Sequence, residues 1–172
     1  MRVILGVDPG YRNLGLAILD ISGPRPSILW SKNKSIGSPS AGMEFVRFLW
    51  PLLDELHTEY GIEAIATETP PFIAGRPKVS ALLWAISSII ASWGHAKGIP
   101  LRHAQPLTLK RACSRILGRE YDRKNIPKKK DIREAVKKLL GARGRTSHED
   151  DAILSIITLY TDLVPDGTTT AA

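Results

Sequence analysis

The chain has 172 residues, 43% of them hydrophobic, so it can build one domain with a real core and is not intrinsically disordered. Its single cysteine excludes a disulfide scaffold and a cysteine-based zinc site. The sequence contains no run of about 18 consecutive apolar residues, so we expect no membrane-spanning helix. The N-terminus lacks the pattern of a secretory signal, so we expect a soluble, cytoplasmic protein with no membrane partner.

Basic charge is concentrated in one part of the chain. The 24 Lys and Arg and 17 Asp and Glu give a net charge of +7. Residues 102–145 hold 15 basic and 4 acidic residues, whereas the other 128 residues carry a net charge of −4. A basic block on a mildly acidic body is typical of nucleic-acid-binding proteins, although a solvated helical face would give the same pattern.

The first third of the chain predicts strands followed by a helix. Apolar, β-branched runs at 3–7, 14–21 and 27–36 predict three strands joined as a hairpin or meander. Apolar residues recur at helical spacing from 41 to 60. Pro51 lies inside this pattern, and we expect it to kink the helix or to end its first half.

Strands and helices alternate in the middle of the chain. Residues 63–68 predict a buried strand, and residues 69–78 are too rich in turn residues for regular structure. A long helix that is apolar on more than one face is predicted at 79–96. A short strand at 100–105 follows, and then a helix at 106–117 that a proline opens and a glycine closes.

The last third predicts two further helices. A charged loop at 119–127 precedes a helix at 128–140. Ser147 is expected to cap a final helix that ends near Leu163.

The order of these elements predicts the fold class. Strands come first and then alternate with helices, which predicts an α/β domain with a mixed sheet and helices on both faces. We expect this domain to span residues 1–164 and to be followed by a small, polar, flexible tail at 165–172.

Three acidic residues stand at the ends of predicted elements. Asp8 ends the first strand, Glu68 ends the strand at 63–68, and Asp151 lies in the first turn of the last helix. His148 precedes Asp151 by three residues, so both side chains share one helical face. Converging carboxylates are what Mg²⁺ prefers, and ligands gather at the carboxyl ends of strands. Each residue alone also fits a turn, a surface or a helix-dipole role, but together they predict a metal site.

These residues belong to motifs that resemble RuvC-type Holliday junction resolvases, in the ribonuclease H-like superfamily. The matching motifs are Gly6-Val7-Asp8-Pro9-Gly10, Asn13-Leu14-Gly15, Glu68-Thr-Pro-Pro-Phe72, Ser80-Ala-Leu and Ser147-His-Glu-Asp-Asp-Ala-Ile. They run in family order from about residue 3 to residue 160. The resemblance implies a ribonuclease H-like mixed sheet and a nuclease that resolves four-way DNA junctions by paired symmetric nicks.

The resemblance also implies the metal chemistry. Two Mg²⁺ ions per active site, with Mn²⁺ as a substitute, would be held by Asp8, Glu68, His148 and Asp151. The ions would activate a water and stabilise the leaving 3′-oxygen. His148 matches a position where other members carry Asp or His, so it is either a ligand or a group that accepts or delivers a proton. A one-residue shift in the alignment would make Asp150 the ligand, and that alternative stays open.

The family's DNA contacts fall on an aromatic residue and on several basic ones. The matching positions are Phe72, Lys110, Lys128, Lys129 and Lys130, and Arg76 is a plausible contact to the DNA backbone without a family match. Phe72 would wedge against bases at the crossover, but it could equally pack in the core. The lysines would neutralise phosphate charge, and Lys129 is the best match in its run. The loop at 119–127 looks longer than the family's usual connection, so the resemblance assigns it no role.

The resemblance implies a homodimer as well. A four-way junction is nearly two-fold symmetric, so two subunits supply two matched sites. The dimer contact would fall on the helix at 79–96, for which a buried core helix is the alternative.

Three other functions compete with this interpretation. Actin-like ATPases and sugar kinases share the Asp-x-Gly start, but 172 residues leave no space for their second half. A related nuclease acting on ribosomal RNA precursors or other branched DNA is the main alternative. The intact Asp8, Glu68 and Asp151 argue against a non-catalytic junction-binding module.

Overall fold

A computed structural model describes residues 2–10, 12–35, 42–122, 124–142, 144 and 146–164; the predicted tail at 165–172 lies outside them. The strands are β1 (Val3–Asp8), β2 (Asn13–Asp20), β3 (Ser27–Ser35), β4 (Ala64–Glu68) and β5 (Leu101–Ala104). The helices are α1 (Gly42–Tyr60), α2 (Pro77–Ala96), α3 (Pro106–Leu117), α4 (Lys129–Leu140) and α5 (Ser147–Tyr160).

The five strands form one mixed sheet in the order β3-β2-β1-β4-β5. The pairs β1–β2 and β2–β3 are antiparallel, whereas β1–β4 and β4–β5 are parallel. Val7 of β1 lies opposite Thr67 of β4. Because β1 and β4 run in the same direction in this register, their last residues, Asp8 and Glu68, lie at the same edge of the sheet.

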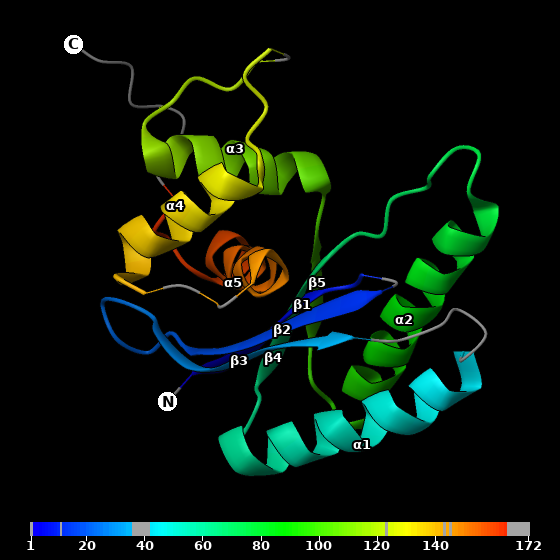
Figure 1. The fold of residues 1–172 in the computed structure, drawn as a ribbon. Coiled ribbons are helices and arrows are strands. Elements are labelled where there is room, and N and C mark those ends of the chain that lie inside the picture. Colours follow the sequence, from blue (N-terminus) through cyan, green and yellow to red (C-terminus); the bar gives the residue numbers. More distant parts are fainter. Residues whose placement is uncertain are drawn as a thin grey trace.

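Helices cover both faces of the sheet, as the sequence predicts. One face packs on α1 and α2, and the other packs on α3, α4 and α5 (Figure 1). Alternate residues of β1 serve the two faces: Leu5 lies in the core with α1 and α2, and Ile4 lies in the core with α5. Since β1 is buried on both faces, its sequence is a continuous apolar run rather than an alternating one.

Two glycines let α5 approach the sheet closely. A Cβ atom on Gly6 would lie 2.3 Å from the carbonyl oxygen of Ala152, and one on Gly15 would lie 2.1 Å from that of His148. No side chain fits at either position without moving the helix. The glycines therefore set the first turn of α5 directly against the end of β1.

Three local expectations differ from the structure. α1 continues through Pro51 without ending there. Leu49 and Leu53 on either side of it are fully buried, so packing holds the helix together despite the missing backbone donor. α2 begins at Pro77, two residues earlier than predicted, because proline suits the first turn. The cap of α5 is Thr146 rather than Ser147, and its hydroxyl accepts a hydrogen bond from the Glu149 amide at 3.3 Å.

Helix α2 is long and apolar enough to cross a membrane by length and composition alone. Its buried residues include Leu83, Ile86 and Trp93, which pack in the same core as β1 and α1. This face of α2 is therefore part of the core of the domain. The opposite face exposes Trp84, which is 49% exposed, among small side chains.

Candidate active site

Three side chains from distant parts of the chain meet where β1 ends. Asp8, His148 and Asp151 each bring one potential ligand atom into a group whose atoms all lie within 4.8 Å of one another. The Nδ1 atom of His148 is 2.6 Å from Oδ2 of Asp8. The His148 and Asp8 side chains are 26% and 15% exposed, so the group is sheltered but reachable from solvent. The carboxylate oxygens are donors that suit Mg²⁺ or Mn²⁺, whereas the imidazole nitrogen of His148 is a donor that transition metals prefer over Mg²⁺.

Glu68 lies beside this group without belonging to it. Burial, and next the negative charge of Asp8, raise the pKa of Glu68 to about 7, while Lys110 opposes the shift. The Glu68 carboxyl therefore lies within electrostatic range of both Asp8 and Lys110. The parallel register of β1 and β4 explains why the two carboxyl groups meet at one edge.

Asp151 is also poorly solvated and close to like charge. Burial, followed by the charge of Asp8, raises its pKa to about 7, and Lys129 opposes the shift. The ammonium group of Lys129 donates a hydrogen bond to Ser147 Oγ at 3.3 Å, in the first turn of α5. A lysine therefore stands next to Asp151, as Lys110 stands next to Glu68. A divalent cation between the carboxylates would relieve the repulsion that raises both pKa values.

The structure separates Asp151 from its neighbour Asp150. Asp150 is fully buried, and its Oδ1 accepts a hydrogen bond from the Gly144 amide at 2.7 Å. Its Oδ2 lies 3.2 Å from Nε of Arg133 in α4. Consecutive residues of a helix point about 100° apart, so only one of the two can face Asp8. Of the two positions left open by the sequence, Asp151 is the one that joins Asp8 and His148.

Sequence reasoning missed the contacts that hold this turn in place. Glu149 is buried, and it accepts a hydrogen bond from Ser31 Oγ of β3 at 2.6 Å. Together with the pair between Arg133 and Asp150, this contact ties the start of α5 to β3 on one side and to α4 on the other. In the sequence, Arg133 is one of many basic residues and Ser31 one of many serines, so neither carries a signal of its own.

Phe72 stands in the segment between β4 and α2, which starts directly after Glu68. The side chain is 79% exposed, which excludes the alternative that it packs in the core. The segment is anchored at both ends, because the Thr69 amide donates to the Ala104 carbonyl at 2.8 Å and the Ile73 amide donates to Ser80 Oγ at 2.8 Å. Phe72 is thus exposed to solvent in a segment that is hydrogen-bonded at both ends and starts directly after Glu68. We call Asp8, His148 and Asp151 the acidic group.

The other predicted DNA contacts lie outside the acidic group. Arg76 is exposed at the N-cap of α2. Lys128 and Lys130 are exposed, and they line a hollow between α3 and α4.

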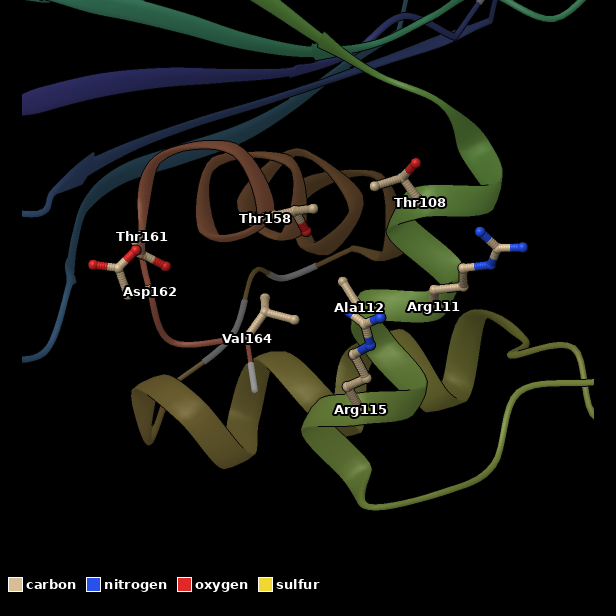
Figure 2. A pocket seen from close by; sticks show the side chains of 8 residues that line it. All are labelled: Thr108, Arg111, Ala112, Arg115, Thr158, Thr161, Asp162 and Val164. Carbon is tan, nitrogen blue, oxygen red and sulfur yellow. The ribbon is translucent and has the colours of Figure 1, made fainter. Parts of the chain in front are cut away.

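A separate hollow of about 430 Å³ lies between α3 and the end of α5 (Figure 2). Its lining includes Arg111, Arg115 and Thr158, but none of Asp8, Glu68, His148 or Asp151. The acidic group therefore lies at an edge of the sheet and is not part of this hollow. An open edge suits a polymer chain that passes across the site.

The sequence matches no protein-family model and no curated protein. Among solved structures, Thermus thermophilus RuvC in complex with a Holliday junction substrate superposes with a TM-score of 0.74 and 19% identity over 92% of each chain. A second structure of that RuvC gives a TM-score of 0.73 and 20% identity, over 91% of this chain and 92% of that chain. The yeast mitochondrial Holliday junction resolvase gives 0.60 and 16%, over 90% of this chain and 75% of that chain. The chain therefore has the ribonuclease H-like fold of RuvC, which confirms the fold that its motifs predict.

Proposed function

We propose that this protein is a metal-dependent endonuclease that resolves four-way DNA junctions. The observation that carries the proposal is the convergence of Asp8, His148 and Asp151 within 4.8 Å at the end of β1, on a RuvC fold. Glu68 adds a further carboxylate beside these three residues. Lys110, near Glu68, and Lys129, near Asp151, supply positive charge that would attract a negatively charged substrate. The solved relatives supply the substrate class, since one of them is bound to a Holliday junction.

Each side chain has a role that follows from its position. Asp8, Glu68, His148 and Asp151 would hold two Mg²⁺ ions, with Mn²⁺ as a substitute. The chemistry supplied by the bound metal is activation of a water and stabilisation of charge on the leaving 3′-oxygen. The Nδ1 contact with Asp8 orients the His148 ring, as ligand or as proton carrier.

The basic and aromatic residues would position the DNA. Lys110 and Lys129 stand next to Glu68 and Asp151, so each can neutralise a phosphate oxygen that approaches the metal. Phe72 is free to stack against bases that open at the crossover. Arg76 and the lysines on either side of Lys129 would contact the phosphate backbone farther from the scissile bond.

We further propose that the protein acts as a homodimer that makes paired nicks. A two-fold axis would give the junction two matched sites. The exposed face of α2, with Trp84 among Ala81, Ala85 and Ser88, is where a second copy would pack closely. The reason for proposing a homodimer is the near two-fold symmetry of a four-way junction, and not the area of this face of α2.

Cleavage of a synthetic junction tests the function. We expect Mg²⁺-dependent nicks at symmetric positions on two opposed strands, and no comparable cleavage of a linear duplex of the same sequence. Asp8→Asn should abolish cleavage while junction binding persists, because the fold and the DNA-contact residues remain. Arg25→Gln, at the opposite edge of the sheet, is the matched control and should cut like the parent. Equal cleavage of junction and linear DNA would contradict resolvase activity, and cleavage by Asp8→Asn would contradict the metal role.

A further inference from the structure

We propose that the groove between the end of α3 and the start of α4 binds the phosphate backbone of a junction arm, as a second DNA contact separate from the metal site. The inference rests on the proposed function and extends it to the loop at 119–127, for which the family resemblance gives no role. The groove has a volume of about 520 Å³. Its lining combines three lysines, Lys124, Lys128 and Lys130, with the apolar Ile126. Arg119 and the carboxylates of Glu120 and Asp131 also line the groove, so its basic residues outnumber its acidic ones by four to two.

The charge of the groove favours an anionic polymer. Lys124, Lys128 and Lys130 are exposed, and within the described part of the chain none of them forms an ion pair. Arg119 also lines the groove, but it is bound to Asp131 at 2.7 Å and to Glu134 at 3.2 Å. The arginine therefore serves the architecture, whereas the three lysine ammonium groups remain available to a ligand.

The three consecutive lysines at 128–130 connect the groove to the candidate active site. Lys129 reaches Ser147 in the first turn of α5, next to Asp151. Its neighbours on both sides, Lys128 and Lys130, line the groove. A backbone whose scissile phosphate lies at Lys129 would therefore have its following phosphates beside the groove. Each strand of duplex DNA carries one charge for about every 3.4 Å of the helix axis, so neighbouring phosphates of one strand can meet several of these lysines.

The groove is preformed, which favours binding. Asp122 Oδ1 accepts hydrogen bonds from the amides of Lys124 and Asn125, at 2.6 and 2.7 Å, and this turn fixes the loop. The guanidinium of Arg111 lies 5.7 Å from the centre of the Tyr121 ring, which ties the loop to α3. A ligand would not need to order the loop, so less conformational entropy is lost on binding.

The composition of the groove distinguishes a nucleic acid from a small anion. A single phosphate would occupy only a small part of a groove of about 520 Å³. Ile126 is 42% exposed beside them, and an apolar side chain suits the face of a deoxyribose rather than a free anion. Charge and apolar surface in one groove match the alternating phosphates and sugars of a DNA strand.

Salt-dependent binding of the full chain to a fluorescent four-way junction tests the proposal, with chelator present to prevent cleavage. The test variant is Lys124→Gln with Lys130→Gln. The control variant is Arg25→Gln with Lys97→Gln, which removes the same charge at the opposite edge of the sheet. Each lost phosphate contact lowers the slope of log affinity against log salt by about 0.9. We expect the test variant to lower the slope by about 1 to 2, and the control variant to keep the parental slope.

Binding to junctions with shorter arms is a second measurement, and its result depends on whether the groove contacts an arm. Trimming the junction arms until they no longer reach the groove should remove the difference between the test variant and the parent. Thermal unfolding should be unchanged in both variants, because all four side chains are on the surface.

The outcomes separate the groove from the proposed function. If the parent cleaves junctions and the test variant keeps the parental slope, the groove proposal is overturned and the function stands. If the parent cleaves no junction but the test variant still loses slope on DNA, the groove stands and the resolvase function falls. If the parent binds no nucleic acid, both are overturned.

Discussion

Replacing Asp151 by asparagine should stabilise the metal-free protein, although it removes a proposed metal ligand. Burial, and next the charge of Asp8, raise the pKa of Asp151 from 3.8 to about 7. Above pH 7 the folded protein therefore holds a carboxylate in a place that favours the neutral acid. Asparagine has nearly the same shape and no charge, so the variant avoids this penalty.

The size of the effect follows from the pKa shift. Each pKa unit corresponds to about 1.4 kcal/mol, so a shift of about 3 units destabilises the fold by up to about 4 kcal/mol at pH 8. The folded-state pKa is above the unfolded value, so the unfolded chain loses its proton first as the pH rises. Stability therefore falls between about pH 4 and pH 7. We expect Asp151→Asn to gain about 2 to 4 kcal/mol at pH 8, and about half of this at pH 5.

Thermal unfolding with chelator at both pH values measures this gain. For a domain of this size, 1 kcal/mol corresponds to about 2–4 °C, so the melting temperature should rise by roughly 5–15 °C at pH 8. Adding Mn²⁺ should narrow the difference by more than half, because saturation at 100 times the dissociation constant stabilises the parent by about 2.7 kcal/mol and the variant by much less. Asp162→Asn, an exposed carboxylate at the far end of α5, is the control and should behave like the parent. A variant that is less stable than the parent at pH 8 with chelator, or that gains as much from Mn²⁺, would refute the shared charged centre.

Three further substitutions test other parts of the site. Phe72→Ala should leave unfolding within about 0.5 kcal/mol of the parent, because the ring is exposed, while junction cleavage falls about ten-fold; equal losses of both would contradict a role in DNA contact. Gly15→Ala should destabilise the protein by about 3 kcal/mol or more in denaturant unfolding, because the new Cβ meets the His148 carbonyl oxygen; a neutral result would contradict the close approach of α5. His148→Asp should retain cleavage with a changed preference between Mg²⁺ and Mn²⁺, measured by titrating each metal, whereas loss of all cleavage would favour a proton-transfer role.

The architecture could be predicted from the sequence because its signals are local. The continuous apolar run of β1 indicates burial on both faces, and α3 has the predicted bounds because Pro106 and Gly118 mark its two ends. Pro51 shows where such rules fail. A proline at this place predicts a kink in the helix or the end of its first half; α1 does not end there, because the buried Leu49 and Leu53 on either side of the proline are held by tertiary packing, whose strength no local pattern encodes.

The candidate metal site could be predicted only in part. Asp8 and Glu68 were found because each ends a strand, and parallel strands bring their ends together. The choice between Asp150 and Asp151 could not be made from the sequence, since both lie in the first turn of a helix whose rotation about its axis depends on packing. That rotation is set by the two glycine contacts of α5 with the sheet.

The run from His148 to Asp151 explains how the fold holds like charges together. Two of its four residues, His148 and Asp151, face Asp8, where repulsion would push the first turn of α5 away from the sheet. The other two face backward, and each is held by a neighbouring element: Glu149 by Ser31 of β3 and Asp150 by Arg133 of α4. A hydrogen bond to a charged group, such as that of Ser31 to Glu149, contributes about 1.5–3 kcal/mol, and the ion pair between Arg133 and Asp150 adds a second attachment. The two anchored residues in the middle of the turn therefore help to keep His148 and Asp151, on either side of them, close to Asp8, where they could receive a cation.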